Sequence, residues 1–167
     1  MPRTPTADEI IAALNLSPLP LEGGYFRETW RSEVSVPVGG REPASRSAGT
    51  AIYYLLTPDT FSALHRLPDE EIFHFYLGDP VEMLVLEPSG RARVVTLGPD
   101  LIGGQHPQFV VPRGAWQGTK LTSGGKVALL GATIAPGFEF RDLELGARDA
   151  LTQTWPDYAE RIAALTR

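Results

Sequence analysis

The sequence of 167 residues contains no cysteine. Disulfide bonds, thiol nucleophiles and thiolate-bound metals are therefore excluded. It also contains no run of basic residues, and its formal net charge is −5. Because phosphate backbones are bound by concentrated cationic surface, we expect no nucleic-acid partner.

Long apolar runs are also missing from the sequence. A membrane span needs about 20 consecutive apolar residues, so no membrane partner is expected. Residues 1–9 include acids where a secretory signal would be apolar. These features together predict a cytoplasmic protein.

Turn-forming residues, by contrast, are abundant: the chain has 17 glycines and 15 prolines. They divide it into about ten short apolar stretches typical of strands, without the alternation of strand and helix that marks a parallel sheet. We therefore predict one all-β domain over residues 1–167, a double-sheet jelly roll from about residue 22 to residue 145. Residues 34–48 are expected to form a loop, and residues 138–145 a strand.

Both ends of the chain predict short helices. At the N-terminus, Thr6 and Glu9 form a capping box ahead of a helix at residues 8–15. At the C-terminus, residues 147–167 are expected to form helical turns, one of them opened by Pro156 at its first position. We expect the N-terminal helix to lie on the outside of a sheet.

The polar chemistry is concentrated in residues 61–79. Period-two alternation places His65 among apolar neighbours, and it places Glu71 on the same face as Phe73, with His74 on the other face. Because a turn at residues 68–69 separates the two strands, we predict that a hairpin brings His65 and Glu71 together. Such a group on apolar strands predicts a pocket.

Two blocks of the sequence resemble the paired motifs of the cupin superfamily. The first motif contains His-x-His, a glutamate and, after six residues, a glycine. Glu71 and Gly78 match this spacing, while Ala63 and His65 stand at the two histidine positions. The gap after His65 would also admit Glu70 as the glutamate, so both carboxylates remain candidates.

The second cupin motif contains Pro-x-Gly followed, after two residues, by a third histidine. Pro112 and Gly114 match it, and Gln117 occupies the histidine position. Residues 22–29, 51–56, 69–78 and 135–140 are further similar to a small cupin group of unknown function, cupin-5. This resemblance covers about residues 8–165 and implies a jelly roll, usually dimeric, with a pocket inside the barrel.

The resemblance leads to a first hypothesis for the pocket, a metal-dependent oxygenase or isomerase. It implies a divalent metal (iron, nickel, zinc or manganese) on His65, Glu71 and Gln117. These side chains offer one imidazole, one carboxylate and one weak amide donor. Ala63 removes one of the four ligand positions of the superfamily.

A second hypothesis is metal-free acid–base chemistry. The segment around His65 also resembles the strand that carries the catalytic histidine in the dTDP-sugar 3,5-epimerases, which share this fold. In a pocket, burial would lower the pKa of His65 and a nearby carboxylate would raise it. His65 would then be the base that removes a proton next to a carbonyl, Glu71 its orienting partner and Tyr76 an acid, with Tyr25, Tyr53 or Tyr54 as alternatives.

The third hypothesis is a binding module without catalysis, because jelly rolls serve both roles. Its ligand would be a small molecule of carbohydrate or nucleotide-sugar type. The candidate binding residues are Tyr25, Arg27, Phe73, His74, Arg113, Trp116 and Gln117. Tyr25 and Arg27 lie on a strand with charges on both faces, which predicts either a sheet edge or the seam of a homodimer.

Overall fold

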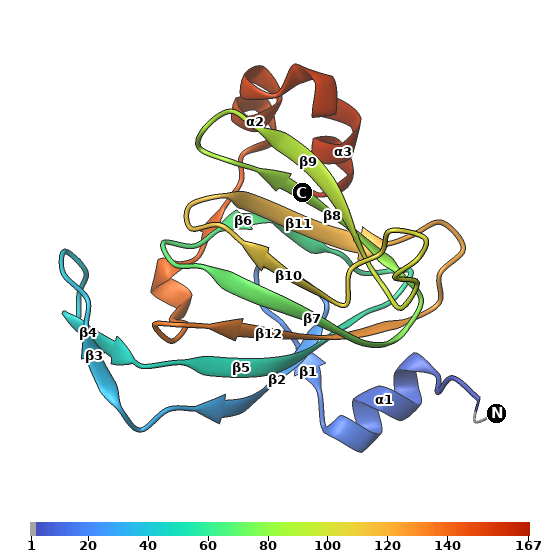
Figure 1. Cartoon of the computed structure of the whole chain (residues 1–167), viewed down its shortest axis with the longest axis horizontal. Coiled ribbons are helices and arrows are strands. Elements are labelled where there is room, and N and C mark those ends of the chain that lie inside the picture. The colour runs from blue at the N-terminus through green and yellow to red at the C-terminus, as the bar shows by residue number, and fades with distance from the viewer. Residues whose placement is uncertain (1–2) are drawn as a thin grey trace.

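The computed structural model describes residues 3–167, and most of its strands form two antiparallel sheets that face each other (Figure 1). The first sheet has six strands in the order β1-β2-β5-β12-β7-β10. The bounds of these strands are β1 Ser17–Pro18, β2 Tyr25–Arg31, β5 Thr50–Leu56, β12 Ala128–Ile134, β7 Glu71–Gly78 and β10 Gln108–Val111.

The second sheet has five strands in the order β13-β6-β11-β8-β9. Its bounds are β13 Glu144–Leu145, β6 Ser62–Arg66, β11 Trp116–Leu121, β8 Val81–Leu86 and β9 Ala92–Leu97. Chain neighbours β8 and β9 pair with each other as an antiparallel hairpin. Leu56, Phe73 and Leu130 from the first sheet pack against Val85 and Leu97 from the second, so the main core lies between the sheets.

Helices cover the outer faces of both sheets, and the sequence predicts this position for the N-terminal one. Helix α1 (Ala7–Leu14) begins at the expected capping box and packs against the first sheet through Ile10 and Leu55. The second sheet is covered by α2 (Arg148–Thr154), the 3₁₀ turn η2 (Pro156–Tyr158) and α3 (Ala159–Ala164), seen in red in Figure 1. Within residues 3–167, no helix is long and apolar enough to cross a membrane.

Three local expectations were wrong. The expected loop at 34–48 contains a two-stranded ribbon, β3 (Ser35–Pro37) paired with β4 (Ser45–Ser47). The expected strand at 138–145 is the 3₁₀ turn η1 (Phe140–Asp142) followed by the two-residue β13. Strands β6 and β7 are not a hairpin: β6 pairs with β11 and β13, whereas β7 pairs with β10 and β12.

The turn between β6 and β7 therefore carries the chain from one sheet to the other. Both strands keep an apolar face toward the interior, and each finds pairing partners far away in the sequence. His65 and Glu71 consequently lie on opposite walls of the same interior. They line one cavity because the two sheets face each other, and not because their strands pair as a hairpin.

Candidate functional site

A cavity opens between the two sheets, with about 620 Å³ of empty space including its open mouth. Three polar side chains, Glu22, His65 and Glu71, form its buried end. Its apolar wall consists of Leu19, Phe26, Ile52, Leu67, Ala132 and Ile134, together with the buried Thr50. The more exposed lining residues are Glu28, Arg31, Phe138, Glu139 and Phe140.

A β-bulge in β6 positions His65. Gln117 pairs with His65 and Thr119 with Ser62, so β6 has one residue more than its partner over this stretch. The Ala63 carbonyl lies 2.7 Å from His65 Nδ1. A carbonyl oxygen only accepts hydrogen bonds, so Nδ1 carries the proton and donates it to Ala63, leaving the Nε2 lone pair of the neutral ring free. His65 is only 2% exposed.

Glu71, the first residue of β7, is the buried carboxyl group on the opposite wall. Burial raises its pKa from 4.5 to about 7, an effect that His65 partly opposes and Glu22 reinforces. Near neutral pH this carboxyl group therefore holds a proton for much of the time. Its neighbour Glu70 is exposed, so the structure identifies Glu71 as the pocket carboxylate.

Gln117 connects the two walls. It lies on β11 beside His65, and its Nε2 donates a hydrogen bond to Glu71 Oε2 in the other sheet. The side chain is almost fully buried, yet its Oε1 has no hydrogen-bond partner within the described chain. Because the amide nitrogen is turned toward Glu71, Gln117 acts here as a donor that favours the ionised form of Glu71.

Glu22 completes the buried end of the cavity, and it is not among the site residues predicted from the sequence. Its Oε1 accepts a hydrogen bond of 2.7 Å from Ser62 Oγ, and its backbone carbonyl accepts one of 2.8 Å from the Ala63 amide. Its Oε2 lies 3.9 Å from His65 Nε2, too far for a direct hydrogen bond. Glu22 precedes Gly23 (φ +103°), where a Cβ would lie 2.4 Å from the Phe61 carbonyl oxygen. An acid directly before two glycines was the available signal.

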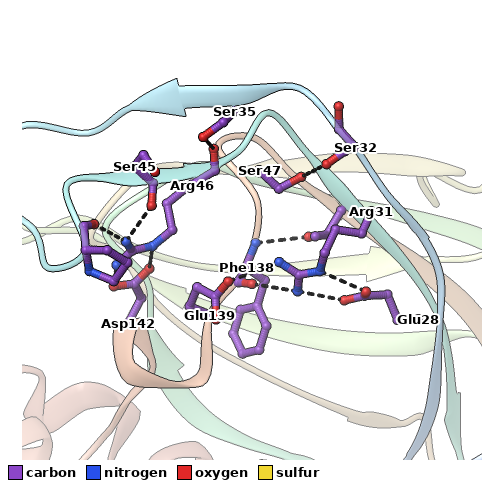
Figure 2. Close-up of polar contacts among 12 residues, drawn as sticks. Glu28, Arg31, Ser32, Ser35, Ser45, Arg46, Ser47, Phe138, Glu139 and Asp142 are labelled. Atoms are coloured by element: carbon purple, nitrogen blue, oxygen red, sulfur yellow. Dashed lines mark hydrogen bonds and ion pairs between the residues drawn. The ribbon is translucent and has the colours of Figure 1, made fainter.

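The mouth of the cavity is crossed by ion pairs around Arg31 (Figure 2). A bulge in β2 turns both Glu28 and Arg31 toward the cavity, although they are three residues apart. Arg31 donates to the Glu28 carboxylate at 3.0 and 2.9 Å, to Glu139 at 3.1 Å and to the Phe138 carbonyl at 3.0 Å. These contacts tie β2 to the segment after β12.

The ribbon β3–β4 braces the same segment from outside. Arg46 of β4 is buried and donates to the two oxygens of Asp142 at 3.1 and 3.0 Å (Figure 2). Ser47 Oγ donates at 2.7 Å to the Ser32 carbonyl, which holds the ribbon to the end of β2. The expected loop is therefore an ordered support for Phe138 and Glu139 at the cavity mouth.

The sequence matches the model of the Cupin_5 family, described as cupin superfamily (DUF985), over residues 8–146. The chain belongs to this cupin family. It is 33% identical to the uncharacterized protein YML079W of Saccharomyces cerevisiae over 132 residues, which cover 72% of this chain. The match spans 66% of the yeast protein, slightly less than two thirds of its length.

Solved structures agree with this assignment. A hypothetical protein from Leishmania major is 31% identical, with a TM-score of 0.87 over 97% of this chain and 99% of that one. Protein SO0799 from Shewanella oneidensis is 32% identical, with a TM-score of 0.86 over 98% and 99%. At the level of the fold alone, the chain is also similar to a Bacillus subtilis oxalate decarboxylase described with Mn(II) centres, which is 16% identical, with a TM-score of 0.53 over 91% of this chain and 38% of that one.

The metal-ligand set of the cupin superfamily is not reproduced here. Within residues 3–167, no three His, Asp or Glu side chains lie close enough together to hold an ion. His65 and Glu71 are present, but Ala63 has no donor side chain, and the Nε2 of Gln117 is directed at Glu71. The residues of this cupin therefore do not fit the metal site implied by the motif.

Four residues that the sequence predicted for the pocket lie instead on the outer face of the first sheet. Arg27 stacks over the ring of Tyr53 at 5.6 Å, and the ring of Tyr76, which is half-exposed, lies 6.1 Å from that of Tyr53. His74 Nε2 lies 3.2 Å from Thr133 Oγ1, and partial burial lowers the pKa of His74. Tyr25 packs with the residues beneath α1.

Three further candidates also lie away from the cavity lining. Phe73 belongs to the main core and is 1% exposed, so its role is packing. Trp116 packs with the C-terminal helices on the outer face of the second sheet, where the Arg66 guanidinium lies 4.5 Å from its ring centroid. Arg113 is exposed in the turn between β10 and β11. The structure thus brings together only His65, Glu71 and Gln117 of the predicted set.

Proposed function

We propose that this cupin binds a carbohydrate-sized ligand in the cavity between its sheets, with His65 as the acid–base residue of isomerase- or epimerase-type chemistry. The observation that supports this proposal most is the state of the His65 ring. Its Nδ1 is fixed by the Ala63 carbonyl, and its Nε2 faces the cavity next to Glu22. A buried imidazole that is oriented through one nitrogen and free at the other is suited to proton transfer.

The chemistry begins with proton abstraction from a carbon next to a carbonyl group. The electron pair of the broken C–H bond moves into the substrate to form an enolate, and His65 Nε2 takes the proton. Glu71, whose pKa is about 7, donates its proton to the developing oxygen from the opposite wall. Protonation of the same carbon on its other face, by water entering through the cavity mouth, gives an epimer; the enol oxygen returns its proton to Glu71 as the carbonyl re-forms, and His65 passes its proton to the hydroxide left behind. If that carbon bears a hydroxyl group, protonation of the former carbonyl carbon by His65 gives an isomer, and the hydroxyl group gives up its proton to Glu71 as it becomes the new carbonyl.

The proposed roles of His65 and Glu71 differ in one respect from the roles expected from the sequence. Glu71 was expected to orient His65, but the backbone carbonyl of Ala63 performs that task. Glu71 is therefore free to act as the acid, with Gln117 holding its other oxygen. Tyr76, half-exposed on the outer face, is not required for this chemistry.

Incubation of keto-sugars with the protein in deuterated water tests the proposal. We expect deuterium to enter at the carbon next to the carbonyl, detected by proton NMR, and the exchange to be lost in His65→Gln. The matched control is His74→Gln, because His74 lies on the outer face and is outside the cavity. Equal exchange rates in the two variants would contradict the assignment of His65 as the base. Binding without exchange would leave a non-catalytic binding module.

The metal-dependent alternative is tested by metal analysis of protein purified without chelators. Near-stoichiometric iron, nickel, zinc or manganese that is lost in His65→Gln would overturn the metal-free proposal. We also propose that the protein is a homodimer, since the outer face of the first sheet exposes Tyr76 and Val110. Light scattering should then give about twice the chain mass of 18.2 kDa, and a monomer mass would contradict it.

A further inference from the structure

The charge balance of the cavity is negative. Four carboxyl groups line it, those of Glu22, Glu28, Glu71 and Glu139. Among the described lining residues, the one guanidinium belongs to Arg31, and its Nε, Nη1 and Nη2 already donate to two of these carboxylates and to a carbonyl. The cavity therefore offers little to a ligand with phosphate groups, which needs uncommitted cationic donors.

The buried end of the cavity presents hydrogen-bond acceptors. In the neutral ring, His65 Nε2 accepts, because Nδ1 holds the proton for Ala63. Glu22 Oε2 also accepts, and the two atoms lie 3.9 Å apart without a direct hydrogen bond between them. Within residues 3–167, Oε1 of Glu22 and Nδ1 of His65 hold the direct hydrogen bonds of these side chains, and the Tyr54 hydroxyl, which donates to the Gly23 carbonyl at 2.8 Å, is a further polar group beside the Glu22 carboxylate. The His65 side chain is 2% exposed, so solvent reaches Nε2 only through the cavity.

A pair of facing acceptors requires a group that donates twice. A ligand hydroxyl has one hydrogen and can satisfy one of the two atoms. A primary ammonium has three hydrogens and one positive charge. Its nitrogen can lie about 2.8 Å from both acceptors at once, because that is the usual length of a charged hydrogen bond and exceeds half of the gap. The spacing of the pair therefore suits a cationic nitrogen.

We infer that the ligand of this cupin carries a primary ammonium group that binds between Glu22 and His65. The ligand class is a hydroxylated amine such as an amino sugar, and nucleotide sugars are selected against. This inference rests on the proposed function of the cavity as the ligand site. A ligand whose ammonium group occupies the Nε2 lone pair is bound without proton abstraction by His65, so the inference deepens the binding form of that function. Phe26 and Phe140, which also line the cavity, add aromatic surface of the kind that attracts organic cations.

A metal ion is a different kind of cation and fits the same atoms less well. Structural and catalytic metal sites use three or more protein donors at roughly 2.0–2.3 Å. Within the described part of the chain, no three His, Asp or Glu side chains converge in this way. An ammonium group is satisfied by two acceptors and one further hydroxyl or water, which this end of the cavity can accommodate.

Matched ligand pairs test the inference by isothermal titration calorimetry. The pairs are glucosamine with glucose, galactosamine with galactose, and tyramine with its alcohol analogue, and UDP-glucose represents the nucleotide sugars. We expect the amine of at least one pair to bind at least about tenfold more tightly than its hydroxyl partner, which corresponds to one charged contact in place of a neutral one. UDP-glucose should bind less tightly than glucosamine.

Glu22→Gln is the deciding variant because glutamine keeps the oxygen that accepts from Ser62 and replaces only Oε2. We expect it to remove the preference for the amine while binding of the hydroxyl partner changes little. Glu160→Gln, at an exposed site in the first turn of α3, removes the same charge elsewhere and should keep the preference. A preference for the hydroxyl partner or for UDP-glucose, or an unchanged preference in Glu22→Gln, would overturn the inference but leave the cavity as a ligand site. If none of the amines, their hydroxyl partners or UDP-glucose binds, the proposed function is overturned as well.

Discussion

Substitution of Glu71 by glutamine should change how the stability of the protein depends on pH. The pKa of Glu71 is about 7 in the folded protein, against 4.5 for an ordinary glutamate, chiefly because the group is fully buried. Between these two values the folded state holds a proton that the unfolded state has lost. Rising pH therefore favours the unfolded chain across this window, and the free energy of unfolding of the natural protein should fall.

The magnitude follows from the two pKa values. Each pH unit between them corresponds to about 1.4 kcal/mol. Ionised Glu71 therefore costs the folded state about 3 kcal/mol above pH 7, and this penalty is absent below pH 4.5. In Glu71→Gln the penalty disappears, and the new amide can donate to Gln117 Oε1, which has no partner in the described structure. The variant should thus gain stability relative to the natural protein as the pH rises.

Urea unfolding at pH 5, 6, 7 and 8 measures this difference directly. We expect the difference in unfolding free energy between variant and natural protein to grow by roughly 2–3 kcal/mol from pH 5 to pH 8. Glu70→Gln is the control, because Glu70 is the adjacent residue and is exposed. The difference in unfolding free energy between this variant and the natural protein should stay nearly constant from pH 5 to pH 8. A Glu71→Gln difference that is independent of pH, or that shrinks as the pH rises, would refute the assignment of a raised pKa to this buried carboxyl group.

Four further substitutions separate packing from ligand binding. Gly78→Ala should destabilise the protein by about 2 kcal/mol or more, because φ is +100° and the new Cβ would lie 2.2 Å from the Val127 carbonyl oxygen. Gly90→Ala should cost only about 1 kcal/mol in the same urea assay, since φ is +89° but no described atom lies within 4 Å of the Cβ. Equal losses of unfolding free energy in Gly78→Ala and Gly90→Ala would contradict a steric clash at Gly78. Phe73→Ala should lower the unfolding free energy by about 3–5 kcal/mol, as expected for a large side chain that is 1% exposed in the core, and a smaller loss than 1 kcal/mol would count against that placement. Tyr76→Phe should leave ligand affinity and deuterium exchange unchanged, and a loss of either would place the site on the outer face.

The elements whose signals are local could be predicted from the sequence. The capping box at Thr6, the buried strand at residues 50–56 and the hairpin at residues 81–97 are each encoded within a few neighbouring residues. The jelly-roll class followed from the density of turns and from the absence of βα units. His65 and Glu71 were found from the alternation along their strands, and Gln117 because it stands at the third histidine position of the superfamily motif.

The remaining parts of the site depend on features that period-two alternation does not contain. Bulges near Thr29 and Ala63 change which side chains face inward, so Arg31 was not recognised as a cavity residue. Glu22 lies in a turn, and its partner Ser62 is 40 residues away in the sequence. Alternation along β7 places Tyr76 on the face opposite Glu71, so the expected role of Tyr76 as an acid in the pocket went against this pattern, and Tyr76 is in fact half-exposed on the outer face.

The position of a bound ligand tests the central claim most directly. A crystal structure of the protein with the probe that binds most tightly should show that molecule in the cavity between the sheets, with a donor group between Glu22 Oε2 and His65 Nε2. Electron density for the ligand on the outer face of the first sheet, next to His74 and Tyr76, with the cavity containing only water, would contradict it.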